Sequence, residues 1–253
     1  MVKKWQITIS EFEDNSPRNL YIYLPLSYSS SHKRYPVLYM FDGHNLFFDS
    51  DATYGKSWGL KKYLDKNRVD LIVVAPECSH HPDNGRLKEY APYTFTDTTF
   101  GQIEGHGRTT MEWMIHVLKK EIDQQFRTRR GREYTYIAGS SMGGLMSLYA
   151  LIQYNQVFSR AAALSPSLWT TPDKLTALIR KSRLSPDTIC YMDYGSEEFR
   201  NHPGMEAVYR QITNELEDRH ILLTNRIVPG GKHCEASWEK QLPFVIPALL
   251  YKK

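Results

Sequence analysis

Short, nearly continuous apolar runs that alternate with segments of helical periodicity constrain the fold of this chain most strongly. Such runs suit strands that are covered on both faces, and each of them ends in residues that begin loops. The apolar runs lie at 35–43, 71–77, 133–139, 160–167 and 188–196, and the helical patterns at 109–126, 145–152, 172–182, 204–219 and 239–253. This alternation predicts an α/β fold, with a mostly parallel central sheet and helices on both of its faces.

The sequence near the N-terminus has a different pattern, in which apolar and polar residues alternate. Alternation of this kind is typical of antiparallel strands that have one solvent-exposed face. It covers residues 7–12 and 19–28, and a last strand is expected at 222–231. We therefore expect an antiparallel pair beside the parallel strands.

Two of the helical patterns contain signals at or inside their ends. Thr109 and Glu112 stand three residues apart at the start of one pattern, which matches a capping box. Pro243 and Pro247 lie inside the last pattern, where we expect the terminal helix to break.

Composition is that of an ordinary globular chain. The 253 residues include 32 basic and 28 acidic side chains, a net charge of +4 that gives no reason to expect nucleic acid as a partner. No segment is apolar enough to span a membrane, and the N-terminus lacks the apolar core of a signal peptide. The three scattered cysteines fit reduced thiols in a cytoplasm. Because no linker or repeat divides the sequence, we expect one domain over residues 1–253.

Gly139, Ser140, Ser141, Met142 and Gly143 match the pattern G-x-S-x-G, with Ser141 at its centre. An apolar strand pattern precedes the motif and a helical pattern follows it, which is the context this motif requires. A sharp turn from strand to helix exposes the central hydroxyl and points the helix N-terminus at any developing oxyanion. We therefore expect Ser141, rather than Ser140, to be a nucleophile.

A serine hydroxyl needs a base to become a good nucleophile. His233 follows the last expected strand, and Gly230 and Gly231 allow its loop to reach the edge of the sheet. His220 follows a charged helix end and is interpreted as a surface residue, while His202 could line the site. His233 is the expected base.

An acid should hold that histidine in one tautomer, and the strand at 188–196 offers three candidates. Asp193 falls inside the strand, whereas Glu197 and Glu198 follow the turn after it. We favour Glu198 and leave Glu197 open. The resulting order of serine, acid and histidine is that of α/β-hydrolases.

An oxyanion hole requires two backbone N–H groups. The first is expected from Met142, directly after the nucleophile. The second is expected from the loop after an early central strand, where Gly43 makes the turn and His44 follows it.

Four segments together resemble the putative esterase family, which is similar to enterochelin esterases, feruloyl and acetyl xylan esterases, S-formylglutathione hydrolase and the mycolyltransferases. They are "MFDGHNLF" at 40–47, "EYTYIAGSSMGGLMSLYALIQYNQVFSRAAALSPSLW" at 133–169, "YMDYGSEE" at 191–198 and "GGKHCEASWEKQLP" at 230–243. The resemblance extends from about residue 19 to residue 249. It implies an α/β-hydrolase fold.

The resemblance also implies roles for individual residues. Ser141 matches the nucleophile, Glu198 the acid, His233 the base, and His44 the residue that donates an oxyanion N–H. A glutamate stands where many members of the family have an aspartate. Because its side chain is longer, this departure leaves the choice between Glu197 and Glu198 open.

The resemblance implies neither a cofactor nor a metal. A separate search for metal ligands by spacing considers His80, His81 and Asp83, but adjacent histidines rarely face the same point. No metal site is therefore predicted.

Several residues are candidates for contact with a substrate. The polar loop at 75–93 follows a central strand, and loops in this position cover the site in such folds. The candidates are Trp58, His80, Arg86, Tyr90, Tyr93 and Trp169.

We expect a serine carboxylesterase that hydrolyses a small-molecule ester through an acyl-enzyme. Acyl, feruloyl-sugar and siderophore esters are all candidate substrates. Two alternatives remain open: an acyltransferase that uses the same triad, and a non-catalytic binding module on a hydrolase scaffold. The sequence gives no indication of an oligomeric state.

Overall fold

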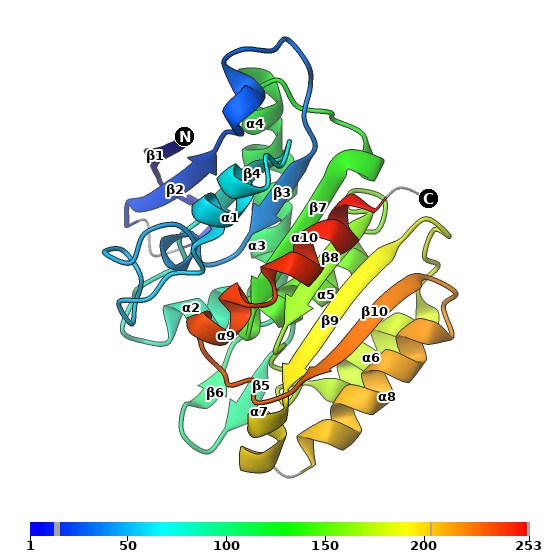
Figure 1. Ribbon diagram of the computed structural model, residues 1–253. Helices are drawn as coiled ribbons and strands as arrows, with labels where there is room; N and C mark the ends of the chain where they lie inside the picture. Colours follow the sequence, from blue (N-terminus) through cyan, green and yellow to red (C-terminus); the bar gives the residue numbers. More distant parts are fainter. Residues whose placement is uncertain (13–15, 203, 252–253) are drawn as a thin grey trace.

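An eight-stranded, mostly parallel sheet forms the centre of the computed structural model, which describes residues 1–12, 16–202 and 204–251. The strand order is β1-β2-β4-β3-β7-β8-β9-β10 (Figure 1). The strands are β1 Val2–Ile7, β2 Arg18–Tyr23, β3 Val37–Met40, β4 Ile72–Pro76, β7 Thr135–Ser140, β8 Arg160–Leu164, β9 Ile189–Gly195 and β10 Leu222–Val228. Neighbours from β4 to β10 are parallel, whereas β2 pairs antiparallel with β1 and β4. The predicted α/β architecture is confirmed.

Helices cover both faces of this sheet. One core contains side chains of α1 Leu60–Lys66, α9 Glu235–Glu239 and α10 Leu242–Leu250. The other core contains side chains of α3 Gly107–Trp113, α4 Lys119–Gln125, α5 Met142–Gln153, α6 Pro172–Lys181 and α8 Met205–Glu217. Successive strand residues alternate between the cores, as Leu38 and Tyr39 do. In Figure 1, α10 crosses in front of the central strands.

The five central runs all form buried strands, but the N-terminal strand was predicted in the wrong place. A strand was expected at 7–12, whereas β1 ends at Ile7. The pairing of β1 with β2 sets this register, in which Val2 lies opposite Tyr23 and Ile7 opposite Arg18. The predicted strand at 19–28 likewise ends at Tyr23, shortly before Pro25, which has no N–H to donate.

Two predictions about helix ends were also wrong. The helix expected to start at Thr109 begins at Gly107, so Thr109 lies inside α3 and no side chain caps the helix. The terminal helix breaks between α9 and α10 rather than at a proline. Pro243 stands at the start of α10, where its missing N–H costs little, and Pro247 is accommodated inside the helix.

Several short elements follow no strong sequence pattern. They are α2 Gly85–Glu89, α7 Ser196–Asn201, and a two-stranded hairpin of β5 Phe95–Asp97 and β6 Gly101–Ile103. These elements lie near the carboxyl ends of the central strands (Figure 1). In the described ranges, every helix is too short or too polar to cross a bilayer.

Candidate active site

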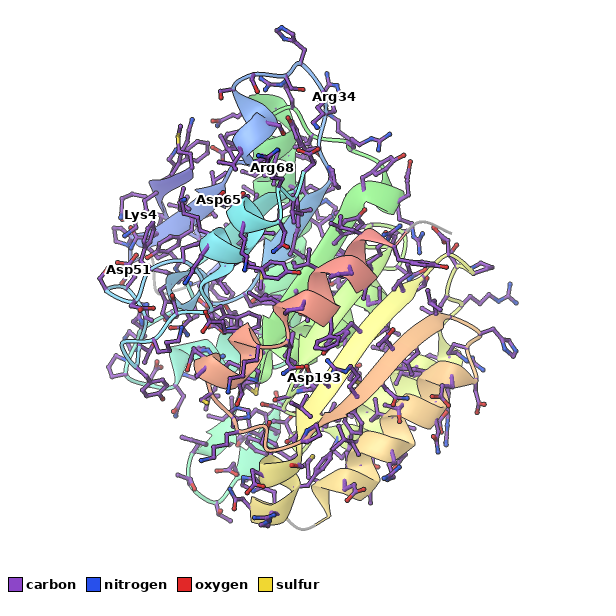
Figure 2. All side chains as sticks on the ribbon, in the orientation of Figure 1. Lys4, Arg34, Asp51, Asp65, Arg68 and Asp193 are labelled. Atoms are coloured by element: carbon purple, nitrogen blue, oxygen red, sulfur yellow. The ribbon has the colours of Figure 1, made fainter. Side chains whose placement is uncertain are left out.

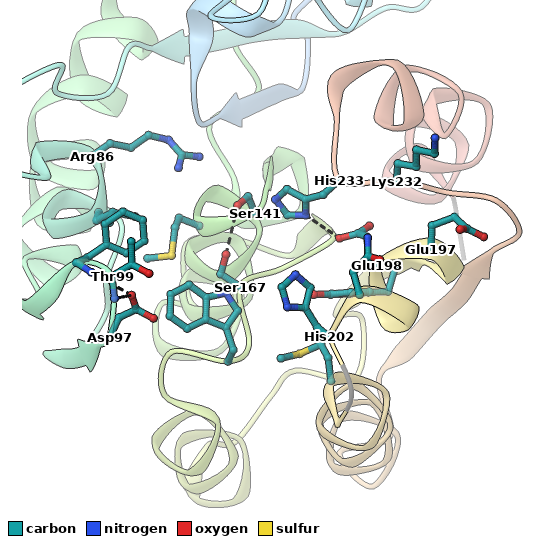
Figure 3. A pocket seen from close by; sticks show the side chains of 17 residues that line it. Arg86, Asp97, Thr99, Ser141, Ser167, Glu197, Glu198, His202, Lys232 and His233 are labelled. Carbon is teal, nitrogen blue, oxygen red and sulfur yellow. Dashed lines mark hydrogen bonds and ion pairs between the residues drawn. The ribbon is translucent and has the colours of Figure 1, made fainter.

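A cavity of about 970 Å³ opens beyond the carboxyl ends of the parallel strands. Parallel α/β sheets place their ligands at this edge. Ser141, Glu198 and His233 all line the cavity (Figure 3). Three residues that are 57 and 35 positions apart in sequence therefore meet at one site.

Ser141 occupies the sharp turn between β7 and α5. Its backbone has φ 57° and ψ −125°, a conformation that is strained for a residue with a side chain. The flanking glycines allow this turn because a Cβ on Gly139 would lie 2.7 Å from the Gly143 backbone. A Cβ on Gly143 would in turn lie 2.9 Å from the Cβ of Phe41. Both glycines of the motif are therefore required by the close packing around the turn, as well as by the sharpness of the turn itself.

The His233 imidazole contacts Glu198 through its Nδ1, which lies 2.6 Å from Oε2 of the carboxylate. Glu198 is 4% exposed, whereas His233 is more open to the cavity. Figure 3 shows the His233 ring between Ser141 and Glu198. With Nδ1 facing the acid, Nε2 is the ring nitrogen available for proton transfer.

Two donors hold the Glu198 carboxylate from behind. The Ser165 hydroxyl donates to Oε1 at 2.7 Å, and the Gly195 N–H donates to the same oxygen at 3.0 Å. The Trp238 indole N–H donates to the Ser165 hydroxyl at 3.0 Å, and its ring packs edge-on against His233. Because a carboxylate held by several donors keeps one orientation, this network fixes the imidazole as well.

The adjacent carboxylate, Glu197, points away from His233 and forms an ion pair with Arg200 at 3.0 Å. Of the two candidates for the acid, only Glu198 contacts the histidine. The Ser141 hydroxyl lies 3.3 Å from the Ser167 hydroxyl. In the described part of the chain, no hydrogen bond joins Ser141 to His233, and such bonds are often long before substrate binds.

The two backbone N–H groups expected to form the oxyanion hole make no hydrogen bond with the described residues. They belong to Met142, the first residue of α5, and to His44 in the loop after β3. Asp42 starts that loop in the left-handed conformation, with φ 57°. Arg86 binds the Asp42 carboxylate through two hydrogen bonds of 2.7 Å. Burial alone would raise the pKa of Asp42, but the Arg86 guanidinium holds it below its usual value.

Gly43 is the tightest point of this loop, since a Cβ there would lie 2.1 Å from the carbonyl oxygen of Ala75. We expect Gly43→Ala to lower the free energy of unfolding by about 3 kcal/mol or more, because backbone must move. Urea denaturation measures the loss. Gly55→Ala is the control, since its Cβ meets open space and only its φ of 69° opposes the change, at about 1 kcal/mol. Equal losses in the two variants would contradict the packing argument.

Of the expected substrate contacts, Arg86 and Trp169 line the cavity, and His202 does too. Trp58, His80, Tyr90 and Tyr93 are not among its lining residues. Trp58 is 2% exposed and packs against Trp238, while Tyr90 is buried against Phe41. These aromatic side chains belong to the core.

Sequence reasoning missed the contribution of the β5–β6 hairpin. Asp97, Thr99 and Phe100 of this hairpin line the cavity, and Figure 3 shows Asp97 and Thr99 on the other side of Ser141 from Glu198. Lys232, next to His233, and Tyr194 of β9 also line it. A short polar hairpin has no regular alternation of apolar and polar residues, so only the residues of its turn could have indicated it in the sequence.

Asp193 is a second buried carboxyl close to the site but does not contact His233. It lies on β9 in the interior of the molecule (Figure 2) and is 1% exposed. Burial raises its pKa to about 7, although hydrogen bonds from Tyr191 and Ser165 favour the ionised form. Asp193 is therefore a source of pH-dependent stability rather than the partner of the base.

We expect Asp193→Asn to be more stable than the wild-type chain at pH 8, and the two to converge near pH 4. A carboxyl whose pKa is raised on folding stabilises the folded state most below its unfolded pKa of 3.8, and this contribution is lost as the pH rises to about 7. The difference at pH 8 is at most about 4 kcal/mol. Urea denaturation across this pH range measures it. A difference that stays constant between pH 4 and pH 8 would contradict the argument.

The fold is that of α/β-hydrolases, which place a serine turn, an acid and a histidine at this edge of the sheet. The chain belongs to the esterase family described as "Putative esterase", whose sequence profile matches residues 13–249. The resemblance seen in the sequence is thereby confirmed. Membership of this family makes the chain a carboxylic ester hydrolase.

Individual proteins show the same similarity. The uncharacterized protein YbbA of Bacillus subtilis (strain 168) is 27% identical over 221 residues, which cover 86% of this chain and 82% of YbbA. A ferulic acid esterase has a TM-score of 0.71 at 17% identity, and the match covers 98% of this chain and 97% of that one. An IroE-like serine hydrolase from Shewanella oneidensis has a TM-score of 0.76 at 18% identity, covering 98% and 79%. At these identities the two structures establish the fold.

Proposed function

We propose that this chain is a serine carboxylesterase, with Ser141 as nucleophile, His233 as general base and Glu198 as the acid that orients the base. The observation that carries the proposal is the 2.6 Å contact between His233 and Glu198 on the wall of the cavity that Ser141 also lines. Serine, histidine and acid act together only when the base is held in one tautomer. No metal or cofactor has a part in this proposal.

In the acylation half, the Ser141 oxygen attacks the ester carbonyl carbon, and Nε2 of His233 accepts the hydroxyl proton. The Glu198 carboxylate stabilises the resulting imidazolium without taking its proton. The tetrahedral intermediate then collapses, the bond to the alcohol oxygen breaks, and His233 returns the proton to the departing alcohol.

In the deacylation half, His233 removes a proton from water, which attacks the acyl-Ser141 ester. Collapse of the second tetrahedral intermediate releases the carboxylic acid and returns the proton to Ser141. Each half passes through an oxyanion on the former carbonyl oxygen. The N–H groups of Met142 and His44 are the donors proposed for it, because both are directed by fixed backbone and lack partners among the described residues.

The lining of the cavity suits a small-molecule ester with an aromatic part. Trp169 and Phe100 are 41% and 44% exposed, and both line the cavity with Tyr194. Exposed aromatic side chains in a cavity provide flat apolar surface for stacking. Since one neighbour in fold is named a ferulic acid esterase, feruloyl esters belong among the first substrates tested.

Hydrolysis of p-nitrophenyl esters from acetate to octanoate, together with feruloyl and siderophore esters, tests the proposal. We expect activity in the wild-type chain, and the profile of acyl chain length measures the acyl part of the cavity. Added alcohols and sugars separate hydrolysis from acyl transfer, since transfer would yield new esters in place of free acid. A folded protein that hydrolyses none of these esters would contradict the proposal.

A further inference from the structure

Three side chains of types that bind metals lie close together outside the proposed Ser141, Glu198 and His233 triad, although the backbone N–H of one of them, His44, is a proposed oxyanion donor. This cluster consists of His44 in the loop after β3, and Cys78 and His80 in the loop after β4. Because β3 and β4 are parallel neighbours, their loops leave the sheet at the same edge (Figure 1). Cys78 and His80 are two residues apart, a spacing that places both side chains on one side of an extended segment.

The donor atoms of these side chains are close enough to share one ion after a small adjustment. One ring nitrogen of each histidine and the Cys78 sulfur all lie within 4.8 Å of one another. The rings of His44 and His80 meet edge to face, with centroids 5.1 Å apart. Ligand atoms around a tetrahedral zinc ion are about 3.5 Å apart. A change in the exposed His80 side chain can supply the remaining movement.

His44 provides an independent indication that a ligand belongs here. It is 5% exposed, and its Nδ1 is buried without a hydrogen-bond partner among the described residues. Its Nε2 lies 3.1 Å from the Thr53 hydroxyl, so Nδ1 is the ring nitrogen that remains available to bind a metal ion. A buried polar atom without a hydrogen-bond partner destabilises the folded protein, so a ligand for Nδ1 is expected. A metal-bound histidine usually binds the ion through one ring nitrogen and a second group through the other, as His44 could do here.

The charges around the cluster suit a cation. Cys78 is 2% exposed and lies near the carboxylates of Asp42 and Glu89, while His44 also lies near Glu77. Arg86 and Arg18 neutralise Asp42 and Glu89 respectively. Burial and the nearby Asp42 carboxylate raise the pKa of the Cys78 thiol, so a divalent ion must displace the thiol proton to bind the sulfur.

We propose that His44, Cys78 and His80 bind a thiophilic divalent cation of the zinc type, with water as the fourth ligand. One thiolate and two imidazoles form a ligand set typical of zinc. The ion would link the loops after β3 and β4. Binding breaks the S–H bond of Cys78, whose electron pair forms the bond to the metal while the proton passes to solvent.

Cobalt titration of the metal-free protein tests this proposal, because tetrahedral cobalt bound to thiolate has visible bands and a near-ultraviolet charge-transfer band. We expect one equivalent of Co²⁺ to produce both, with release of about one proton per ion. Zinc should displace the cobalt and abolish the bands. Excess zinc should also raise the melting temperature above that measured with a chelator.

The chain offers matched control variants. Cys78→Ser should lose the charge-transfer band, whereas Cys234→Ser, which alters the partly exposed one of the three thiols, should keep it. His80→Ala should weaken binding at least about tenfold, whereas His81→Ala, which loses an exposed ion pair with Asp83 and a long hydrogen bond from the Asp83 N–H, should not. His80 is exposed, so its variant tests the site even if Cys78→Ser fails to fold. A wild-type chain without the charge-transfer band, or a His80→Ala variant that binds cobalt as tightly as the wild type, would overturn the proposal.

Discussion

Replacing Ser141 by alanine is expected to lower kcat for ester hydrolysis by a factor on the order of 10⁴ or more. Without the hydroxyl no acyl-enzyme forms, and only the oxyanion donors and substrate binding continue to assist water attack. Ser141 lies in a strained turn, and replacing its side chain by that of alanine removes no contact on which the fold depends. Initial rates with p-nitrophenyl acetate measure the effect, and circular dichroism checks that the variant folds.

The adjacent serine provides the matched control. Ser140 is the last residue of β7 and is 7% exposed, so its side chain faces the core rather than the cavity. We expect Ser140→Ala to retain activity within about tenfold of the wild-type chain. If folded Ser141→Ala kept substantial activity and Ser140→Ala lost it, the assignment of Ser141 as the nucleophile would be wrong.

Glu198→Gln is expected to lower kcat by about 10³- to 10⁴-fold while the protein remains folded. The glutamine oxygen can still accept from Ser165 and Gly195, and its amide N–H₂ then faces Nδ1 of His233. That contact favours the tautomer with the proton on Nε2, which cannot accept the proton of Ser141. The expected change is in kcat, with KM little altered, because the carboxylate acts on the reaction through His233.

Glu197→Gln is the matched control for this variant. Glu197 forms an ion pair with Arg200, whose side chain is largely exposed, and exposed ion pairs contribute little to stability. We expect its kcat to stay within about threefold of the wild-type value. If Glu197→Gln were the more damaging of the two substitutions, the assignment of the acid would be wrong.

The central strands and the serine turn could be predicted from sequence because both follow strong local rules. Strands such as β3 and β4 are buried on both faces and must be apolar throughout. The G-x-S-x-G pattern reflects the close approach of Gly139 to the Gly143 backbone and of Gly143 to the Phe41 side chain, which leaves no room for a larger residue. Long-range pairing instead set the position of β1, so the local alternation at 7–12 was misleading.

The choice between Glu197 and Glu198 depended on where a helix begins, which sequence determines poorly. Because α7 starts at Ser196, Glu198 is its third residue, and its carboxylate accepts from the Gly195 N–H before the helix. A residue one position away points about 100° elsewhere around the helix axis. The turn before α7 therefore decides which carboxylate contacts His233.

The substrate side could be predicted least. Trp58 and Trp169 have the same chemistry in the sequence, yet one is buried against Trp238 and the other is exposed in the cavity. The aromatic content of a sequence does not separate core from binding surface. The sequence also did not predict the cluster of His44, Cys78 and His80. His44 is far from the other two in sequence, and only the fold brings the two loops together.

Labelling with a serine-directed fluorophosphonate, followed by peptide mass spectrometry, tests the central claim most directly. The reagent mimics the tetrahedral intermediate and reacts only with a serine that a base activates. We expect one equivalent of label on Ser141, with loss of esterase activity in step with labelling, and greatly slowed labelling in folded His233→Ala. Label on another residue, or a protein that hydrolyses esters while Ser141 stays unlabelled, would contradict the account.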